Sequence, residues 1–174
     1  MVGKIRSSLT HWGWLFLVKV VCIDGRNVAH TNSGGKIQWS NLLIATEALI
    51  EAGYIAIHLF IPFWSRGQIP ADLYIKLERS VIFHLSGTEE KDRDDKDMIA
   101  WSIMLNADIL TNDKLKNHVE NGLVQQSRLD EKQICFQIDN EKLDLIPKSS
   151  QINDFKSGLN LSKNHTDLIP ESSG

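Results

Sequence analysis

Residues 18–30 read Val-Lys-Val-Val-Cys-Ile-Asp-Gly-Arg-Asn-Val-Ala-His, and this stretch decides the fold. Its apolar, β-branched run stops at Asp24 and is followed at once by Gly25, which predicts a buried strand that ends in a carboxylate and then turns. An ionised carboxylate at the end of a core strand needs a partner, and ligands of open α/β sheets bind at the carboxyl ends of the strands. A simpler interpretation is that Asp24 caps the following turn, and the motif alone leaves both open.

Strand-like and helix-like segments alternate after this stretch. A helix is predicted from Trp39 to Gly53, because apolar residues recur along one helical face and a glycine follows them. Residues 55–62 are apolar almost throughout, which is typical of a strand that is buried on both faces. A strand, a helix and a strand of these lengths form a βαβ unit with a right-handed crossover.

The same patterns continue through the rest of the domain. They predict a loop at 63–67, a short helix opened by Pro70, a strand at 81–85, a polar loop at 86–93, a helix from Asp94 to Leu105, a strand at 108–113, a helix at 115–120 and a strand at 134–138. We therefore expect an α/β, Rossmann-like three-layer sandwich, with a central, mostly parallel sheet of about five strands between layers of helices.

The chain of 174 residues is long enough for one domain with a real core and short extensions. We expect a lead-in segment at 1–17, the domain at 18–147 and a polar, disordered tail at 148–174. The lead-in resembles a signal peptide in layout, but polar residues interrupt its apolar run and no small-residue cleavage site follows. The run is also too short to span a bilayer, so no membrane association is expected.

Two features of the composition narrow the possible functions. The net charge is −3, so a polyanion would have to be bound by a locally basic surface. Cys22 and Cys135 lie in apolar runs, which predicts buried, reduced thiols and a cytoplasmic protein. No GxGxxG, GxxxxGK[ST] or HExxH motif is present in the sequence, and His58 and His84 are expected to pack in or beside strands.

Four carboxylates are expected at one edge of the sheet, because strand ends and the starts of the following helices share that edge. They are Asp24, Asp94, Asp95 and Asp113. Helix capping would explain Asp94 or Asp95 alone, and surface charge would explain Asp113 alone. Together, however, these like charges repel one another, and a divalent cation such as Mg²⁺ removes the conflict. We favour this metal-binding interpretation.

Several motifs resemble the NYN domain of the Regnase-type ribonucleases, a branch of the PIN-like nucleases. They are residues 21–29 (Val-Cys-Ile-Asp-Gly-Arg-Asn-Val-Ala), 59–64 (Leu-Phe-Ile-Pro-Phe-Trp), the Asp94-Asp95 pair and 107–113 (Ala-Asp-Ile-Leu-Thr-Asn-Asp). The resemblance spans about residues 18–147. It implies a PIN-like fold and assigns Mg²⁺ binding and catalysis to Asp24, Asp94, Asp95 and Asp113, with Mn²⁺ as a substitute. It also implies that Asn27 positions the substrate or an acidic ligand.

The chain departs from the family pattern in two places. The family commonly has a further acid four residues after the last aspartate, where this chain has Asn117. The loop before the aspartate pair, which is basic in the family, carries less net positive charge here, since Glu89, Glu90 and Asp92 accompany Lys91 and Arg93. We therefore expect a weaker or differently placed grip on the substrate.

The resulting hypothesis is a Mg²⁺-dependent endoribonuclease that hydrolyses phosphodiester bonds of single-stranded RNA. Cations expected to bind phosphates are Arg26, Arg66, Lys91 and Arg93, and Trp64 or His30 would stack on a base. One alternative is a non-catalytic RNA-binding or protein-docking module, and another is a nuclease acting on DNA. The sequence is also compatible with a homodimer and with a protein partner that binds the tail. In the tail, residues 167–170 repeat the Asp-Leu-Ile-Pro of residues 144–147, either as a docking motif or by chance.

Overall fold

The computed structural model describes residues 18–31, 34, 36–87 and 92–147. In these residues a six-stranded sheet has the order β3-β2-β1-β4-β5-β6. Strands β1 to β5 run parallel to one another, and β6 pairs with β5 in the antiparallel direction. The strands are β1 (Val20–Asp24), β2 (Ala56–Pro62), β3 (Ile82–Ser86), β4 (Asp108–Leu110), β5 (Gln133–Asp139) and β6 (Lys142–Pro147).

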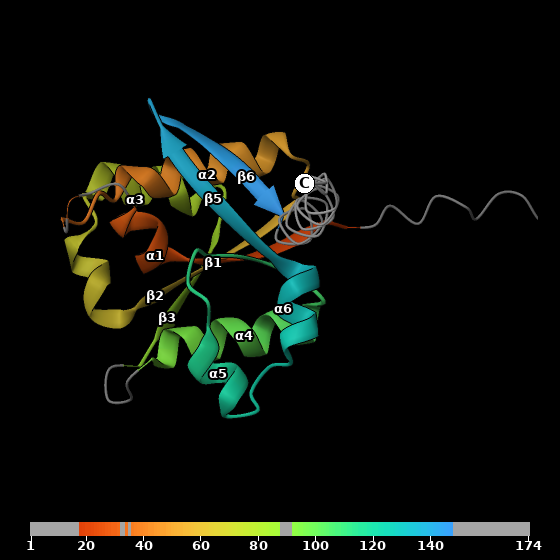
Figure 1. Cartoon of the computed structure of the whole chain (residues 1–174). Coiled ribbons are helices and arrows are strands. Elements are labelled where there is room, and N and C mark those ends of the chain that lie inside the picture. Colours follow the sequence, from red (N-terminus) through yellow and green to blue (C-terminus); the bar gives the residue numbers. More distant parts are fainter. Residues whose placement is uncertain (1–17, 32–33, 35, 88–91, 148–174) are drawn as a thin grey trace, which may run out of the picture.

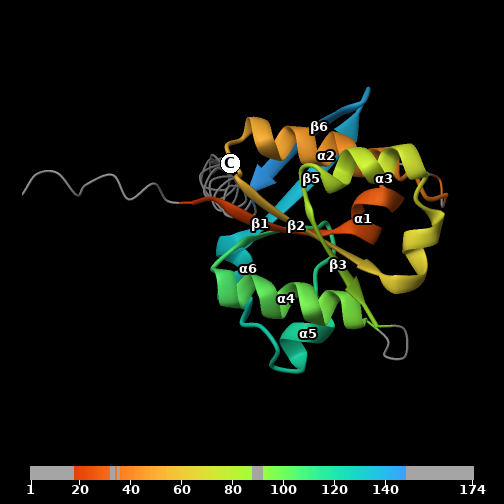
Figure 2. The ribbon, with the colours of Figure 1, turned by 180° about the vertical axis from the view of Figure 1, so that it is seen from behind.

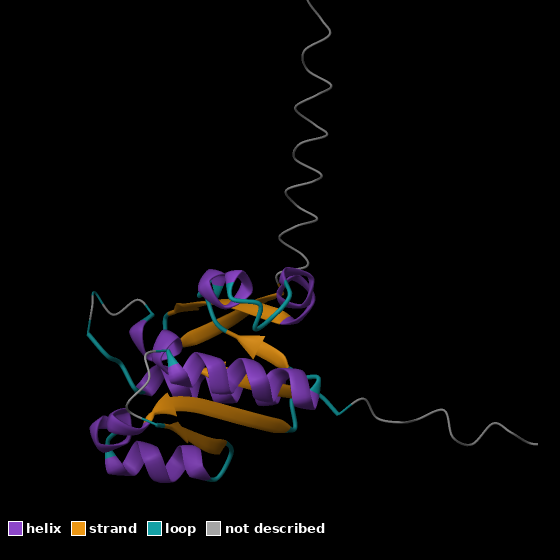
Figure 3. Ribbon diagram, turned by 90° about the horizontal axis from the view of Figure 1, so that it is seen from below, coloured by secondary structure: helices purple, strands orange, loops and turns teal. Residues whose placement is uncertain are grey.

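Helices cover both faces of this sheet, as Figure 1 and the reverse view in Figure 2 show. Helices α1, α2 and α3 form one layer, and α4, α5 and α6 form the other. Figure 3 shows a long helix that runs alongside the strands. The helices are α1 (Gly25–His30), α2 (Ser40–Glu51), α3 (Ala71–Glu78), α4 (Arg93–Leu105), α5 (Lys116–Glu120) and α6 (Gln126–Lys132), and a 3-10 helix, η1 (Phe63–Gln68), precedes α3. The predicted α/β sandwich is confirmed.

Strand β1 lies at the point where the order of the strands reverses. From β1 the chain builds β2 and β3 on one side, and it then returns to place β4 on the other. In open α/β sheets this reversal leaves a crevice at the carboxyl ends of the two central strands, where ligands bind. Asp24 is the last residue of β1, so the fold places this carboxylate at the crevice.

Two hydrophobic cores hold the layers together, one on each face of the sheet. Along β2, Leu59 and Ile61 pack into the core under α1, α2 and α3, whereas Phe60 packs into the core under α4. All three are at most 1% exposed. This alternation confirms a strand buried on both faces, although it begins at Ala56 and the predicted first residue, Ile55, is 73% exposed.

The segment after Asp24 is a short helix, α1, rather than the predicted turn. Gly25 is required there by close packing: a Cβ at this position would clash with the side chain of Ile61 and lie 2.8 Å from the Phe60 carbonyl oxygen. The glycine therefore lets α1 start directly against β2. The predicted loop at 63–67 is likewise the 3-10 helix η1.

Two elements near the carboxyl end of the domain were not predicted. Helix α6 precedes β5, and β6 adds a sixth strand where about five were expected. The hairpin between β5 and β6 turns at Asn140 and Glu141, which both have positive φ (47° and 61°). Leu143 and Leu145 of β6 pack against the core under α2. The apolar alternation of β6 is short and interrupted by charge, which explains why the pattern was missed.

Both cysteines are free thiols, as expected, but only Cys22 is buried, and Cys135 is partly exposed. His58 and His84 lie in β2 and β3 with their rings 5.1 Å apart, which confirms their predicted packing. The predictions for 1–17 and 148–174 lie outside the described residues. Among the residues described, no helix has the length and apolar character needed to cross a membrane.

Candidate active site

Asp24 is held at the junction of β1 and α1 by hydrogen bonds to both of its carboxylate oxygens. The backbone N–H of Asn27 donates to Oδ1 (3.0 Å), so Asp24 caps α1. The hydroxyl of Thr111 donates to Oδ2 (2.8 Å). The capping interpretation is therefore correct, and Asp24 also lines a pocket at the sheet edge, so the two interpretations of this residue are compatible.

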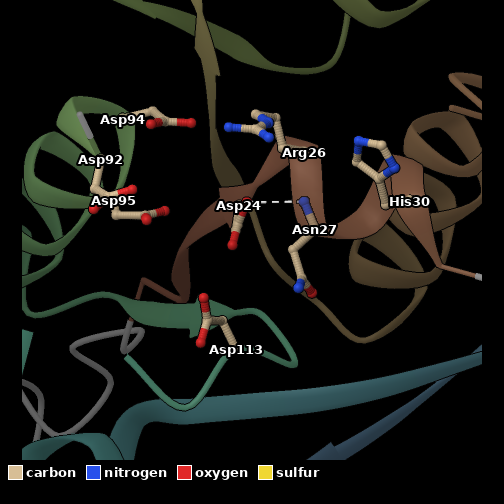
Figure 4. A pocket seen from close by; sticks show the side chains of 8 residues that line it. All are labelled: Asp24, Arg26, Asn27, His30, Asp92, Asp94, Asp95 and Asp113. Atoms are coloured by element: carbon tan, nitrogen blue, oxygen red, sulfur yellow. Dashed lines mark hydrogen bonds between the residues drawn. The ribbon is translucent and has the colours of Figure 1, made fainter. Parts of the chain in front are cut away.

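The other three predicted aspartates reach the same pocket from two further elements. Asp94 and Asp95 lie in the first turn of α4, and Asp113 follows β4, where its Oδ1 accepts a hydrogen bond from the Leu115 backbone (3.2 Å). Figure 4 shows these carboxylates around one space. The pocket has a volume of about 290 Å³ and is lined by Asp24, Arg26, Asn27, His30, Asp92, Asp94, Asp95 and Asp113.

Burial and the nearby negative charges raise the pKa of two of the carboxyl groups. Burial raises the pKa of Asp24 to about 6; the hydrogen bonds from Asn27 and Thr111 oppose this effect, and the charges of Asp94 and Asp113 add to it. Burial also raises the pKa of Asp95 to about 7, together with repulsion from the neighbouring aspartates. Such shifts mean that the folded site disfavours the ionised forms of these two carboxyl groups, chiefly because they are buried and further because like charges lie nearby.

The donor set of the pocket fits a hard divalent cation, because it consists of carboxylate oxygens from three separate elements. Within the part of the chain that the structure describes, however, no three His, Cys, Asp or Glu side chains form a group that could hold a metal ion in their present rotamers. The aspartates thus share one pocket without forming a closed coordination sphere. Metal binding by Asp24, Asp94, Asp95 and Asp113 stays a prediction.

Thr111 is a site residue that the sequence reasoning missed. Its side chain is fully buried; its hydroxyl donates to Asp24 and accepts a hydrogen bond from the backbone N–H of Asp113 (3.1 Å). One hydroxyl thereby fixes the ends of β1 and β4 relative to each other. The available signal was its position: it is a polar residue directly after an apolar strand, two residues before a predicted ligand.

The predicted substrate residues are divided between the pocket and its surroundings. Asn27 and Arg26 line the pocket. The Asn27 Oδ1 accepts a hydrogen bond from the Asn112 backbone (2.8 Å), so this side chain braces the segment after β4. The guanidinium of Arg26 lies 5.5 Å from the centre of the Trp64 ring, which is 47% exposed. Arg26 and Trp64 therefore form one aromatic and cationic surface beside the aspartates.

Two predicted cations lie outside the lining of the pocket. Arg66 stacks over the Tyr74 ring on α3 at 5.3 Å, and Arg93 forms an ion pair with Asp97 one turn along α4 (2.9 Å). The predicted Lys91 lies outside the described residues. Asp92, which we expected only to dilute the basic loop, instead lines the acidic pocket. Of the predicted cations that the structure describes, Arg26 is the one that lines the pocket.

Comparison with known proteins agrees with this architecture. A family model described as the Zc3h12a-like Ribonuclease NYN domain matches residues 17–155. No curated protein has a sequence that matches this one significantly.

Two similar solved structures both come from Arabidopsis thaliana. One is nuclear protein-only RNase P 2 (PRORP2), with 15% identity, a TM-score of 0.53 and coverage of 75% of this chain and 30% of that chain. The other is a crystal structure of nuclear proteinaceous RNase P 2 (PRORP2), with 13% identity, a TM-score of 0.54 and coverage of 73% and 29%. This chain thus spans less than a third of either, and at this identity the likeness concerns the fold. The family match covers most of the chain, and the protein belongs to the Zc3h12a-like ribonuclease NYN domain family.

Proposed function

We propose that this protein is a Mg²⁺-dependent endoribonuclease that cleaves single-stranded RNA. The observation that carries the proposal is the pocket at the β1–β4 crevice, where Asp24, Asp94, Asp95 and Asp113 meet from three elements. Membership of a ribonuclease domain family supports RNA as the substrate. The raised pKa values of Asp24 and Asp95 support a cation, because a bound divalent ion would stabilise the ionised carboxylates that burial, and to a lesser degree repulsion, disfavours.

The four aspartates would hold Mg²⁺, or Mn²⁺ in its place, through their carboxylate oxygens. When bound there, the ion would lower the pKa of water and stabilise the negative charge that develops on the phosphate in the transition state. Thr111 and the Asn27 backbone orient Asp24 for this task, since they occupy one lone pair on each of its oxygens. The cluster itself repels phosphate, so binding of RNA needs positive charge nearby.

That charge would come from Arg26, which lines the pocket and whose guanidinium lies 5.5 Å from the centre of the Trp64 ring. We propose that Arg26 contacts a phosphate next to the scissile bond and that Trp64 stacks on an unpaired base. Arg66 and Arg93 would contact the strand farther from the scissile bond. Asn27 would position the substrate or an acidic ligand, and its Oδ1 accepts a hydrogen bond from the Asn112 backbone. Stacking on a free base requires an unpaired strand, which supports single-stranded RNA over duplex.

A cleavage assay tests the proposal directly. We expect wild-type protein to cut an end-labelled, unstructured RNA with Mg²⁺, and to lose this activity with EDTA or in Asp24→Asn by about 10²-fold or more. Asp144→Asn is the matched control, because Asp144 is an exposed aspartate on β6 away from the pocket. Cleavage that survives both EDTA and Asp24→Asn would overturn the proposal.

The same assay separates the two alternatives. A single-stranded DNA of the same sequence is included, and faster cleavage of the DNA would favour a DNA nuclease. Asn117 favours the non-catalytic module, because it places a neutral side chain where the family commonly has an acid. RNA binding without cleavage, unaffected by Mg²⁺, would favour a non-catalytic module. Cytoplasmic location, a homodimer and a protein partner for the tail stay predictions.

A further inference from the structure

A buried histidine lies behind the acidic pocket. His118 belongs to α5 and is 7% exposed. It lines a cavity of about 170 Å³ together with Asp92, Asp95, Asp113, Leu115, Lys116 and Asn117. Three of these residues, Asp92, Asp95 and Asp113, also line the acidic pocket, so the two cavities adjoin at these aspartates. His118 and Asn117 therefore border these carboxylates from a second cavity, which neither Arg26 nor Asn27 lines.

The imidazole of His118 faces Asp95, with its Nε2 3.7 Å from Oδ2. This distance is too long for a direct hydrogen bond and suits an ion pair or a bridge through one water. The histidine backbone is fixed on both sides: its N–H donates to the Leu115 carbonyl (3.0 Å), and its carbonyl accepts from the Leu123 N–H (2.9 Å). The ring therefore cannot leave Asp95 by a shift of the backbone without loss of these bonds.

Asp95 differs from Asp24 and Asp113 in the hydrogen bonds that its carboxylate accepts. Asp24 accepts two hydrogen bonds and Asp113 accepts one. Among the residues that the structure describes, no hydrogen bond reaches the Asp95 carboxylate, and His118 is the partner within 4.0 Å. Repulsion from Asp24, Asp94 and Asp113 acts on Asp95 at the same time. A rotamer change toward solvent would relieve that repulsion unless something opposes it.

We propose that His118 is a positioning residue, which keeps the Asp95 carboxylate turned into the acidic pocket by donating from Nε2 through one water. This inference rests on the proposed function and deepens it. Asn117, which lines the same cavity, carries no charge, and the adjacent His118 is the residue of this cavity with a recorded contact to Asp95. Groups that orient metal-binding side chains in this way commonly change metal affinity about 10–100-fold when they are removed.

Binding of Mn²⁺ to RNA-free protein, measured by calorimetry, tests the inference independently of catalysis. The matched variants are His118→Gln and His118→Met, because the two side chains have similar length and only glutamine donates a hydrogen bond. We expect His118→Met to bind Mn²⁺ about 10–100-fold more weakly than wild type, and His118→Gln to recover most of the affinity. Glu120→Gln is the control on the same helix, at an exposed position.

A double-mutant cycle shows whether the histidine acts through Asp95. In an Asp95→Asn background, His118→Met should cause no further loss of Mn²⁺ affinity. In cleavage assays, the Mg²⁺ concentration for half-maximal rate should rise in His118→Met, while the rate at saturating Mg²⁺ stays close to wild type. Equal losses in the Gln and Met variants, or losses that add to Asp95→Asn, would overturn the inference.

The outcomes also distinguish this inference from the proposed function. A wild-type protein that binds no Mn²⁺ and cuts no RNA overturns both. Mg²⁺-dependent cleavage with an unchanged His118→Met variant overturns the role of His118 alone. Should the His118 variants fail to fold, the histidine side-chain NMR signals decide: Mg²⁺ should shift the His118 signal in wild type and leave it unmoved in Asp95→Asn. An equal shift in both proteins would overturn the inference.

Discussion

Thr111 joins two acidic positions that lie far apart in the sequence. Its hydroxyl donates to Asp24 and accepts from the backbone N–H of Asp113, and its side chain is fully buried. A buried donor or acceptor without a partner costs about 1–3 kcal/mol, so this hydroxyl contributes to stability as well as to the geometry of the carboxylates. At the scale of single residues, the site depends on neutral side chains as much as on aspartates.

The first prediction concerns this hydroxyl. Thr111→Val keeps the shape of the side chain but leaves an oxygen of Asp24 and the Asp113 N–H without their partner. We expect a loss of about 1–3 kcal/mol in the free energy of unfolding, measured by urea denaturation, and weaker Mn²⁺ binding. Thr111→Ser should retain most of both properties because it keeps the hydroxyl. A valine variant as stable as wild type would contradict this account.

The second prediction concerns Asn117, which lines the cavity behind Asp95 and Asp113. Asn117→Asp adds a carboxylate where the family commonly has one. We expect the Mg²⁺ concentration for half-maximal cleavage to fall several-fold, because the added carboxylate attracts the ion by about 1 kcal/mol. In EDTA the same variant should be less stable than wild type, because another anion joins the cluster. Asn121→Asp, at the exposed end of α5, is the control and should leave metal dependence unchanged.

At the scale of elements, α1 is the part of the fold that carries Arg26 and Asn27 to the pocket. Its position depends on how closely its first residue approaches β2. Gly25 packs against the Phe60 carbonyl and the Ile61 side chain, with no room for a Cβ. Backbone cannot move aside as a flexible side chain does, so this contact determines where α1 begins.

The third prediction follows from this packing. Gly25→Ala should push α1 away from β2, with a loss of about 1–3 kcal/mol in stability, as overpacking of a close contact usually causes. RNA cleavage should fall further than stability explains, because Arg26 and Asn27 move with the helix. Thermal unfolding and cleavage rates are compared with those of Gly67→Ala, a glycine of η1 with open space around its Cα. Equal behaviour of the two variants would contradict the packing argument.

At the scale of the whole molecule, the aspartates proposed to bind the metal ion also lower the stability of the folded protein when they ionise. Asp24 and Asp95 titrate at pKa values of about 6 and about 7 in the folded protein, both above the usual value of 3.8. A carboxyl whose pKa is raised by folding binds its proton more tightly in the folded state. Its contribution to stability is therefore complete below about pH 4 and is lost as the pH rises through 6 and 7.

The fourth prediction follows from this loss of stability as the pH rises. In EDTA, Asp24→Asn should become more stable relative to wild type as the pH is raised from about 4 to 7.5, because asparagine cannot ionise. Saturating Mg²⁺ should stabilise wild type and remove most of the advantage of the variant, because only wild type keeps the full set of carboxylates. Chemical denaturation at each pH measures both effects. A stability difference that does not change with pH would show that Asp24 is not destabilised by ionisation.

The fold was largely predictable, since its signals are local. The apolar run ending at Asp24 and the continuous run at 55–62 each report burial within one element. Right-handed βαβ crossovers then place the ends of parallel strands at one edge. For that reason Asp24, Asp94, Asp95 and Asp113 could be assigned to one pocket before any contact was known. Short elements with weak periodicity, α6 and β6, could not be predicted in this way.

The sequence by itself determined the class of fold and the edge at which the aspartates gather, because strand and helix periodicity is written in neighbouring residues. Only the tertiary structure decided which neutral groups hold those aspartates: Thr111 on Asp24 and His118 beside Asp95. It also decided that Arg26, and not Arg66 or Arg93, lines the pocket. Such contacts join residues far apart in the chain, and they depend on strand register and helix placement, which no local pattern records.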